Sequence, residues 1–110
     1  MKVKVKVWLE KDGRSVMGGG RYALLKAIDE TGSLREACAQ LEISYRHAWG
    51  HIKKLEQSAG FAFVDTKVGG RGGGASALTP QAREFLKQFD ELKSGIEQYA
   101  EQLAKDIKQQ

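Results

Sequence analysis

The chain begins with a regular alternation of apolar and polar positions. Apolar residues occupy the odd positions from Val3 to Leu9, and lysines or Trp8 stand between them. A period of two is typical of a strand with one apolar face. The Asp12-Gly13 pair favours a tight turn. We therefore expect a β-hairpin over residues 1–17 that returns at 15–17, with the glycines at 18–20 separating it from the first helix.

Residues 21–60 carry three successive helical patterns. Leu24, Leu25 and Ile28 predict a helix over 21–31 that Gly32 ends in a left-handed conformation. The run Ser33-Leu34-Arg35-Glu36 matches a capping box, and the apolar spacing that follows predicts a short helix to Leu41. Ser44 can cap a third helix that runs to about Ala59 and stops at Gly60.

About three residues separate the second and third helices, which is the spacing of a helix-turn-helix. Glu42 stands in this turn, where glycine is usual. A left-handed conformation at Glu42 would cost about 1 kcal/mol.

The C-terminal half predicts a glycine-tipped hairpin and a long helix. Alternating apolar residues predict a strand over 61–68, the loop 69–74 reads GGRGGG, and 75–78 can return as a second strand. Thr79 and Pro80 then form a strong start for a helix over 80–108. The order predicts one α+β domain, mostly α, over 1–110: a winged helix-turn-helix with hairpin 1–17, helices 21–60, wing 61–79 and a dimerisation helix 80–108.

Positive charge gathers in particular segments. The chain carries a formal net charge of +4, and its pI is about 9.3. Residues 43–55 and 66–83 contain no acid at all. This concentration favours a polyanionic partner.

The composition is that of a soluble globular protein, and it excludes several classes. No apolar run approaches the roughly 18 residues that a membrane span needs, and the first residues lack the apolar block of a signal peptide. Cys38 is the only cysteine, so no internal disulfide can form. We expect a cytoplasmic protein that is associated with the nucleoid when bound to DNA.

A helical wheel divides the third helix into a core side and a basic side. Ala48, Ile52, Leu55 and Ala59 cluster as core, and Gly50 lies opposite, flanked by Arg46, Lys53, Lys54 and Gln57. Glycine in a helix costs about 1 kcal/mol relative to alanine, so close approach of another surface is a reason to keep it. On a duplex, the first residues of this helix would meet base edges, with Arg46 best suited to guanine and Lys53 and Lys54 to phosphates. The predicted DNA contacts, including the wing, are Ser44, Tyr45, Arg46, His47, Gly50, Lys53, Lys54, Lys67 and Arg71.

Several of these residues have alternative roles. Trp49 is expected to pack against a neighbouring element, plausibly the wing, whereas Tyr45 could pack or touch DNA. His47 and His51 have i, i+4 spacing that can hold a metal, but no third ligand has supporting spacing. We therefore expect no metal or other cofactor, and histidines that contact phosphate or a neighbouring helix.

The loop GGRGGG could cradle a nucleotide phosphate or be a hairpin tip without a ligand. The GxxxxGK[ST] order is absent and the loop leads to a strand, so a wing whose Arg71 reaches DNA is the better interpretation. No arrangement of nucleophile and base supports catalysis, and we do not expect an enzyme.

The last helix carries an apolar series with nearly heptad spacing. At 1.5 Å per residue a helix of about 28 residues spans roughly 42 Å, beyond a domain roughly 30 Å wide. A homodimer would cover the far half, although a fold-back at Gly95 is an alternative. The predicted dimerisation residues are Phe89, Leu92, Ile96, Tyr99, Leu103 and Ile107.

The runs GSLREACAQLEISYRHAW and VGGRGGGASALTPQAREFL together resemble the N-terminal DNA-binding domain of the ModE family of molybdate-responsive transcriptional regulators, a distant relative of the LysR-type head. The resemblance implies a bacterial or archaeal winged helix that dimerises through its terminal helices. It also implies contacts to double-stranded DNA at 44–49 and around Arg71.

Full-length members of the ModE family carry C-terminal molybdate-binding domains, whereas this sequence ends at Gln110. We expect a regulator without a molybdate site, which would sense any effector through a separate partner. The alternative function is a winged-helix interaction module whose basic face docks an acidic protein.

Overall fold

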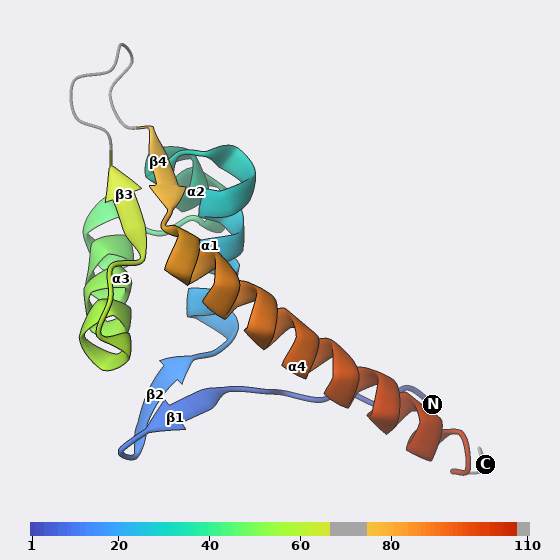
Figure 1. The fold of residues 1–110 in the computed structure, drawn as a ribbon. Coiled ribbons are helices and arrows are strands. Elements are labelled where there is room, and N and C mark those ends of the chain that lie inside the picture. The colour runs from blue at the N-terminus through green and yellow to red at the C-terminus, as the bar shows by residue number, and fades with distance from the viewer. Residues whose placement is uncertain (67–74, 108–110) are drawn as a thin grey trace.

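Three helices stack into a head, and a fourth helix leaves the head as a long arm (Figure 1). The computed structural model describes residues 1–66 and 75–107. Its extents of 59 × 30 × 22 Å reflect the arm. The helices are α1 Gly19–Thr31, α2 Leu34–Leu41, α3 Tyr45–Ala59 and α4 Pro80–Ala104. The winged helix-turn-helix order of elements predicted from the sequence is therefore confirmed.

The strands form two separate antiparallel pairs. β1 Leu9–Lys11 pairs with β2 Arg14–Met17, and β3 Val64–Thr66 pairs with β4 Ser76–Leu78. β3 and β4 form the base of the predicted wing beside α3 (Figure 1). The wing tip, with its GGRGGG loop, lies outside the described residues.

Local capping chemistry sets the helix boundaries. The hydroxyls of Ser33, Ser44 and Thr79 each accept a hydrogen bond from the backbone N–H three residues on. Gly32 and Gly60 end their helices with φ of 68° and 82°. These caps are the ones predicted. The glycines before α1 differ from the expectation, because Gly19 and Gly20 already lie in its first turn.

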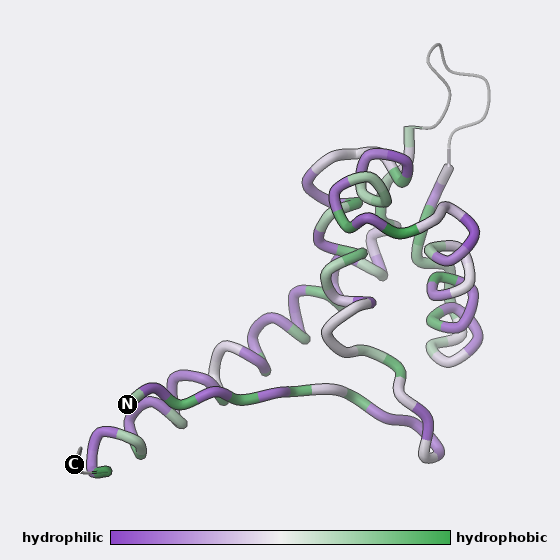
Figure 2. The backbone as a smooth tube through the Cα atoms, turned by 180° about the vertical axis from the view of Figure 1, so that it is seen from behind, coloured by the Kyte–Doolittle hydropathy of each residue, from purple (hydrophilic) through white to green (hydrophobic). Residues whose placement is uncertain are grey.

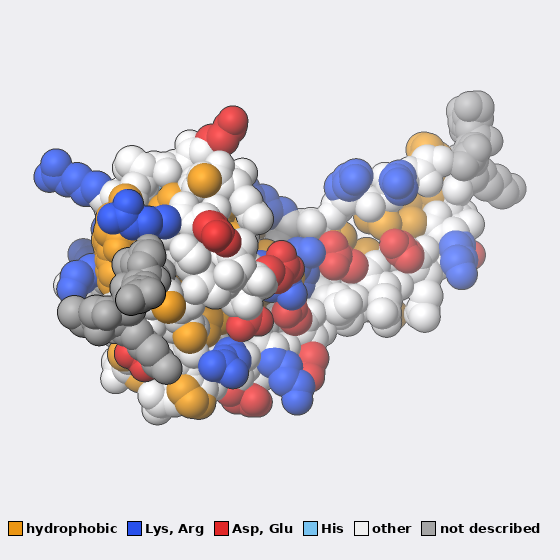
Figure 3. All heavy atoms as spheres, turned by 90° about the horizontal axis from the view of Figure 1, so that it is seen from above, with side chains coloured by type: hydrophobic (Ala, Val, Ile, Leu, Met, Phe, Trp, Pro, Cys, Tyr) orange, Lys and Arg blue, Asp and Glu red, His pale blue; other side chains and the backbone are white. Residues whose placement is uncertain are grey.

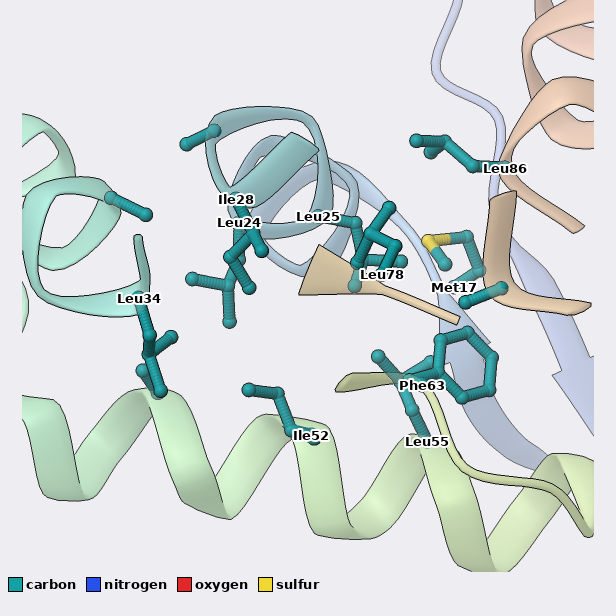
Figure 4. Close-up of a cluster of buried hydrophobic side chains, with 14 of the residues drawn as sticks. Met17, Leu24, Leu25, Ile28, Leu34, Ile52, Leu55, Phe63, Leu78 and Leu86 are labelled. Carbon is teal, nitrogen blue, oxygen red and sulfur yellow. The ribbon is translucent and has the colours of Figure 1, made fainter. Parts of the chain in front are cut away.

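The core joins all three helices of the head to both hairpins. Figure 4 shows Ile52 and Leu55 of α3 facing Leu24 and Leu78. Cys38 is buried with them, and burial raises the pKa of its thiol. In the described part of the chain, no helix is both long enough and apolar enough to cross a membrane.

The N-terminal strand is shorter than its alternation predicts. Pairing begins only at Leu9, which lies opposite Met17. The returning strand β2 ends at Met17, opposite Leu9. Residues 1–8 therefore have no partner strand in this hairpin. Residues 1–5 run instead beside the far half of α4 (Figures 1 and 2). The prediction of a full hairpin over 1–17 was therefore wrong in its first half.

The arm is one continuous helix that side chains fix to the head. It runs unbroken through Gly95, so the fold-back alternative is wrong. Tyr22 of α1 donates a hydrogen bond to Asp90, and Lys26 lies 3.5 Å from the same carboxylate. The Asp90 hydrogen bond, with burial, raises the pKa of Tyr22 to about 12. The orientation of α4 therefore depends on named contacts to α1.

Glu42 adopts the left-handed conformation that the turn requires, with φ 55° and ψ 43°. We predict that Glu42→Gly raises the free energy of unfolding by about 1 kcal/mol, because glycine carries no Cβ penalty there. Urea unfolding followed by circular dichroism measures this change. The matched control is Ala39→Gly in the exposed middle of α2, where glycine is expected to destabilise by about 1 kcal/mol. Equal destabilisation by both would contradict the prediction.

Candidate nucleic-acid interface

The third helix buries one side and exposes a basic one. Ala48, Ile52 and Leu55 are fully buried, and Ala59 is half-buried. The opposite side, which we call the basic face, is entirely exposed and consists of Arg46, Gly50, Lys53, Lys54 and Gln57. The division predicted from the helical wheel is therefore confirmed.

No carboxylate neutralises this face within the described residues. The ion pairs found there are Lys26–Asp90 and Lys93–Glu97, both remote from α3 in the sequence. Glu56 is the only acid in α3, and its Oε2 accepts a hydrogen bond of 2.9 Å from the backbone N–H of Phe63. The acid therefore anchors the chain between α3 and β3, and no described residue forms an ion pair with Arg46, Lys53 or Lys54.

Gly50 leaves a gap in the middle of the basic face. Apart from the neighbouring backbone of α3 itself, a Cβ placed there would meet no heavy atom of the described residues within 4 Å. The fold of the chain itself therefore gives no steric reason for glycine, while its helix cost of about 1 kcal/mol stays. A close-approaching external surface would supply the missing reason.

The structure shows how the two aromatic residues at the start of α3, Tyr45 and Trp49, are packed. Trp49 is half-buried and packs against the core, so its prediction as a packing residue is confirmed. Tyr45 is 45% exposed and meets Trp49 edge to face at 6.2 Å. Arg35 of α2 lies over the Tyr45 ring, 5.6 Å from its centroid. Tyr45 is therefore a packed side chain that still presents nearly half of its surface.

Arg35 is a candidate contact that the sequence did not indicate. It is exposed on α2, and its guanidinium extends the positive surface across the turn of the helix-turn-helix. Its sequence signal is only an exposed arginine within a capping box. The cation–π contact with Tyr45 becomes visible only when the two helices are packed.

The two histidines of α3 join a hydrogen-bonded chain. Arg21 Nε donates to His51 Nδ1 at 3.2 Å, and His51 Nε2 lies 3.1 Å from His47 Nε2. Burial, His47, Arg21 and Lys54 lower the pKa of His51. Among the described residues no group of three or more potential metal ligands is found. Ser44, just before these histidines, caps the helix through the His47 N–H at 3.0 Å.

The predicted wing contacts Lys67 and Arg71 lie outside the described residues. The adjoining strand ends are described, and Thr66 lies opposite Ser76 in the β3–β4 register. Ala75 also bridges to Ser33 at the start of α2. The base of the wing is thus attached to the helix-turn-helix.

The predicted dimerisation residues separate into two groups. Phe89 is only 2% exposed and packs against Tyr22, with ring centroids 5.4 Å apart. Its assignment to a dimer contact was wrong, because the head of its own chain already covers it. The others are 38–63% exposed and form what we call the apolar stripe: Leu92, Ile96, Tyr99, Leu103 and Ile107.

Curated proteins with similar sequences include two bacterial relatives. The molybdenum-pterin-binding protein MopB of Rhodobacter capsulatus is 32% identical over 90 residues, which are 82% of this chain and 33% of MopB. The transcriptional regulator ModE of Haemophilus influenzae is 33% identical over 72 residues, which are 66% of this chain and 28% of ModE. The chain thus spans about a third or less of these relatives' length.

The structural comparison agrees with the fold. A crystal structure of the BenM DBD with benA site 1 DNA superposes with a TM-score of 0.60 at 21% identity, over 79% of this chain and 95% of that one. The model of the bacterial regulatory helix-turn-helix protein, lysR family, matches residues 21–83, which run from the start of α1 to the start of α4. Because this match covers more than half of the chain, the chain belongs to the lysR family of bacterial regulatory helix-turn-helix proteins, with ModE regulators among its relatives.

Proposed function

We propose that this chain is the DNA-binding part of a ModE-like transcriptional regulator that recognises a specific sequence in double-stranded DNA. The observation that carries the proposal is the basic face of α3, which is exposed, free of ion pairs among the described residues and interrupted by Gly50. It lies on the second helix of a helix-turn-helix, the element that enters the major groove in this class. Its role is binding in the cytoplasm, without catalysis.

The side chains of α3 have different tasks in this proposal. Arg46, in the first turn of the helix, reads guanine through its bidentate fork. Lys53 and Lys54 lie about two turns further on and hold phosphates, which sets the register without reading sequence. The glycine at position 50 lets the helix axis approach the duplex. Lys67 and Arg71 of the wing are proposed to contact the backbone or the minor groove beside it.

The regulator is proposed to act as a homodimer through the apolar stripe of α4. A two-fold dimer presents two copies of α3, so its site has two half-sites about one helical turn or a multiple of it apart.

Salt dependence tests the phosphate contacts. Duplexes are selected from a random library with the wild-type chain, and their affinity is measured across a series of salt concentrations. The affinity is expected to fall steeply with salt, and Lys53→Ala should reduce the log–log slope by about 1, because one fewer counterion is released. Lys87→Ala, an exposed lysine on α4, is the matched control and should leave the slope unchanged.

Absence of duplex binding even at low salt would overturn the proposal. Binding of an acidic protein in its place would assign the basic face to a protein partner.

A further inference from the structure

Arg21, far from α3 in the sequence, reaches across from α1 to its histidines. Its Nη1 donates to the carbonyl oxygens of Ser15 and Val16 at 2.8 and 2.9 Å, which holds the guanidinium against β2. Its Nε then donates to His51 Nδ1 at 3.2 Å. The guanidinium is thus fixed at three points, and its position relative to His51 is determined by the backbone of the head.

The chemistry of these groups sets the direction of the chain. A guanidinium can only donate, so His51 Nδ1 must accept. A neutral imidazole carries one hydrogen, which His51 must then carry on Nε2. That N–H points at His47 Nε2, 3.1 Å away, so this atom accepts in turn. The hydrogen of neutral His47 is therefore on Nδ1.

The surroundings keep His51 neutral. Burial is the largest cause that lowers the pKa of His51, followed by the basic groups His47, Arg21 and Lys54. Lys6 of the N-terminal segment also lines the hollow beside His51, together with Arg21. A hydrogen added to His47 Nε2 would face the Nε2–H of His51, so protonation would break the chain.

The hydrogen-bonded series from Arg21 through His51 ends at His47, which lies on the candidate interface. His47 is exposed in the first turn of α3, next to Arg46. Within residues 1–66 and 75–107 its ring forms no hydrogen bond other than the one to His51. The Nδ1–H of His47 can therefore donate to an acceptor on another molecule.

We propose that Arg21 is a positioning residue which, through His51, fixes His47 with its hydrogen on Nδ1, so that α3 presents a directional neutral donor to an acceptor on a base edge. Such acceptors in the major groove are guanine O6 and N7, adenine N7 and thymine O4. The part that concerns DNA rests on the proposed function, whereas the tautomer assignment concerns the free protein alone.

The tautomers are measured by long-range ¹H–¹⁵N correlation of the histidine rings in the full chain at slightly alkaline pH. The wild-type chain should carry hydrogen on His51 Nε2 and His47 Nδ1. Arg21→Met removes the donor and should let both rings exchange between tautomers. Arg83→Met is the matched control, because Arg83 also donates to a backbone carbonyl, that of Leu78 at 3.2 Å. A wild-type spectrum with hydrogen on His47 Nε2 would overturn the proposal.

Arg21 also holds β2, so a second variant separates positioning from folding. His51→Leu leaves the Arg21 bonds to Ser15 and Val16 possible, yet it removes the acceptor–donor link. It should release the His47 tautomer as Arg21→Met does. If the His47 ring of the folded His51→Leu protein keeps its hydrogen on Nδ1, the hydrogen bonds from Arg21 through His51 do not fix the tautomer.

The DNA readout uses duplexes selected by the wild-type chain and scrambled duplexes. His47→Ala and Arg21→Met should each weaken binding to selected duplexes by about 3- to 10-fold, the range of one neutral hydrogen bond, with little effect on scrambled ones. The double variant should be no weaker than His47→Ala, because both act on one donor. Equal weakening on all duplexes would assign the donor to phosphate and overturn the base-edge part. If no duplex binds, the proposed function fails while the tautomer result still stands or falls by itself.

Discussion

Ile96→Glu or Leu103→Glu is expected to convert the proposed dimer into monomers and to weaken binding to a two-half-site duplex by about 100-fold or more. The apolar stripe to which both belong repeats at spacings of four, three, four and four residues, close to a heptad seam. Each of its side chains is 38–63% exposed in the single chain. Burying an apolar side chain of this size contributes about 1.5–3 kcal/mol, so a stripe repeated on two chains can hold a dimer.

Within residues 1–66 and 75–107, the rest of the chain leaves the side chains of this stripe 38–63% exposed. Residues 1–5 share a groove with α4, and of the stripe only Ile107 lines it; the other α4 residues there are mainly polar, including Glu97, Gln98 and Glu101. Figure 3 shows hydrophobic side chains gathered along the projecting arm. Figure 2 shows hydrophilic and hydrophobic residues alternating along the same helix. A second copy of the chain is an occupant that matches the length and the repeat of the stripe.

The size of the expected effect follows from symmetry. One substitution places two carboxylates in the two-fold interface, where each would be desolvated without a partner. Loss of the link between two half-site readers then removes an effective concentration worth about 100- to 10,000-fold in affinity. Light scattering measures the mass, and gel-shift titration measures affinity for duplexes with one and two half-sites. Gln102→Glu, an exposed position beside the stripe, is the charge-matched control. A variant that stays dimeric at wild-type affinity would refute the assignment.

Where local chemistry decides a structure, the sequence was sufficient. The capping hydroxyls at Ser33, Ser44 and Thr79 act within three residues, and each predicted helix start lies within two residues of the observed one. Glu42 stands where such turns usually have glycine, which raised the left-handed conformation as a conditional cost, and the structure shows that conformation. The basic face of α3 followed from the helical period, because Ala48, Ile52 and Leu55 lie together on one side of the helix and form its core side.

Where distant partners decide, the sequence was insufficient. The alternation before Leu9 predicts a strand face, but the length of β2 determines how much of it pairs. The heptad spacing of the apolar residues continues through Phe89 without interruption. Only the packing of Tyr22 against Phe89 shows that Phe89 belongs to the head and not to the exposed stripe. The bond from Arg21 to His51 joins residues 30 positions apart. No periodicity within either helix indicates that such a contact exists.

Arg46→Ala is expected to weaken binding to selected duplexes by about 1–3 kcal/mol and to relax the base preference at one position in each half-site. Arg46 is exposed in the first turn of α3. A cation there opposes the helix dipole, so its removal should leave the fold as stable or slightly more stable. The protein therefore keeps this charge where its own fold gains nothing from it, as expected for a residue that serves a partner.

Two further variants separate a reading contact from a merely attractive one. Arg46→Lys keeps the charge but loses the planar fork, so it should lose most of the base preference and only part of the affinity. Lys54→Ala should weaken selected and scrambled duplexes alike, because a phosphate contact carries no sequence. Selection from a random library with each variant measures the preference, and titration at fixed salt measures the affinity. An Arg46→Ala chain that selects the wild-type sequences with unchanged preference would show that Arg46 holds phosphate, and that the specificity of α3 comes from its other exposed side chains.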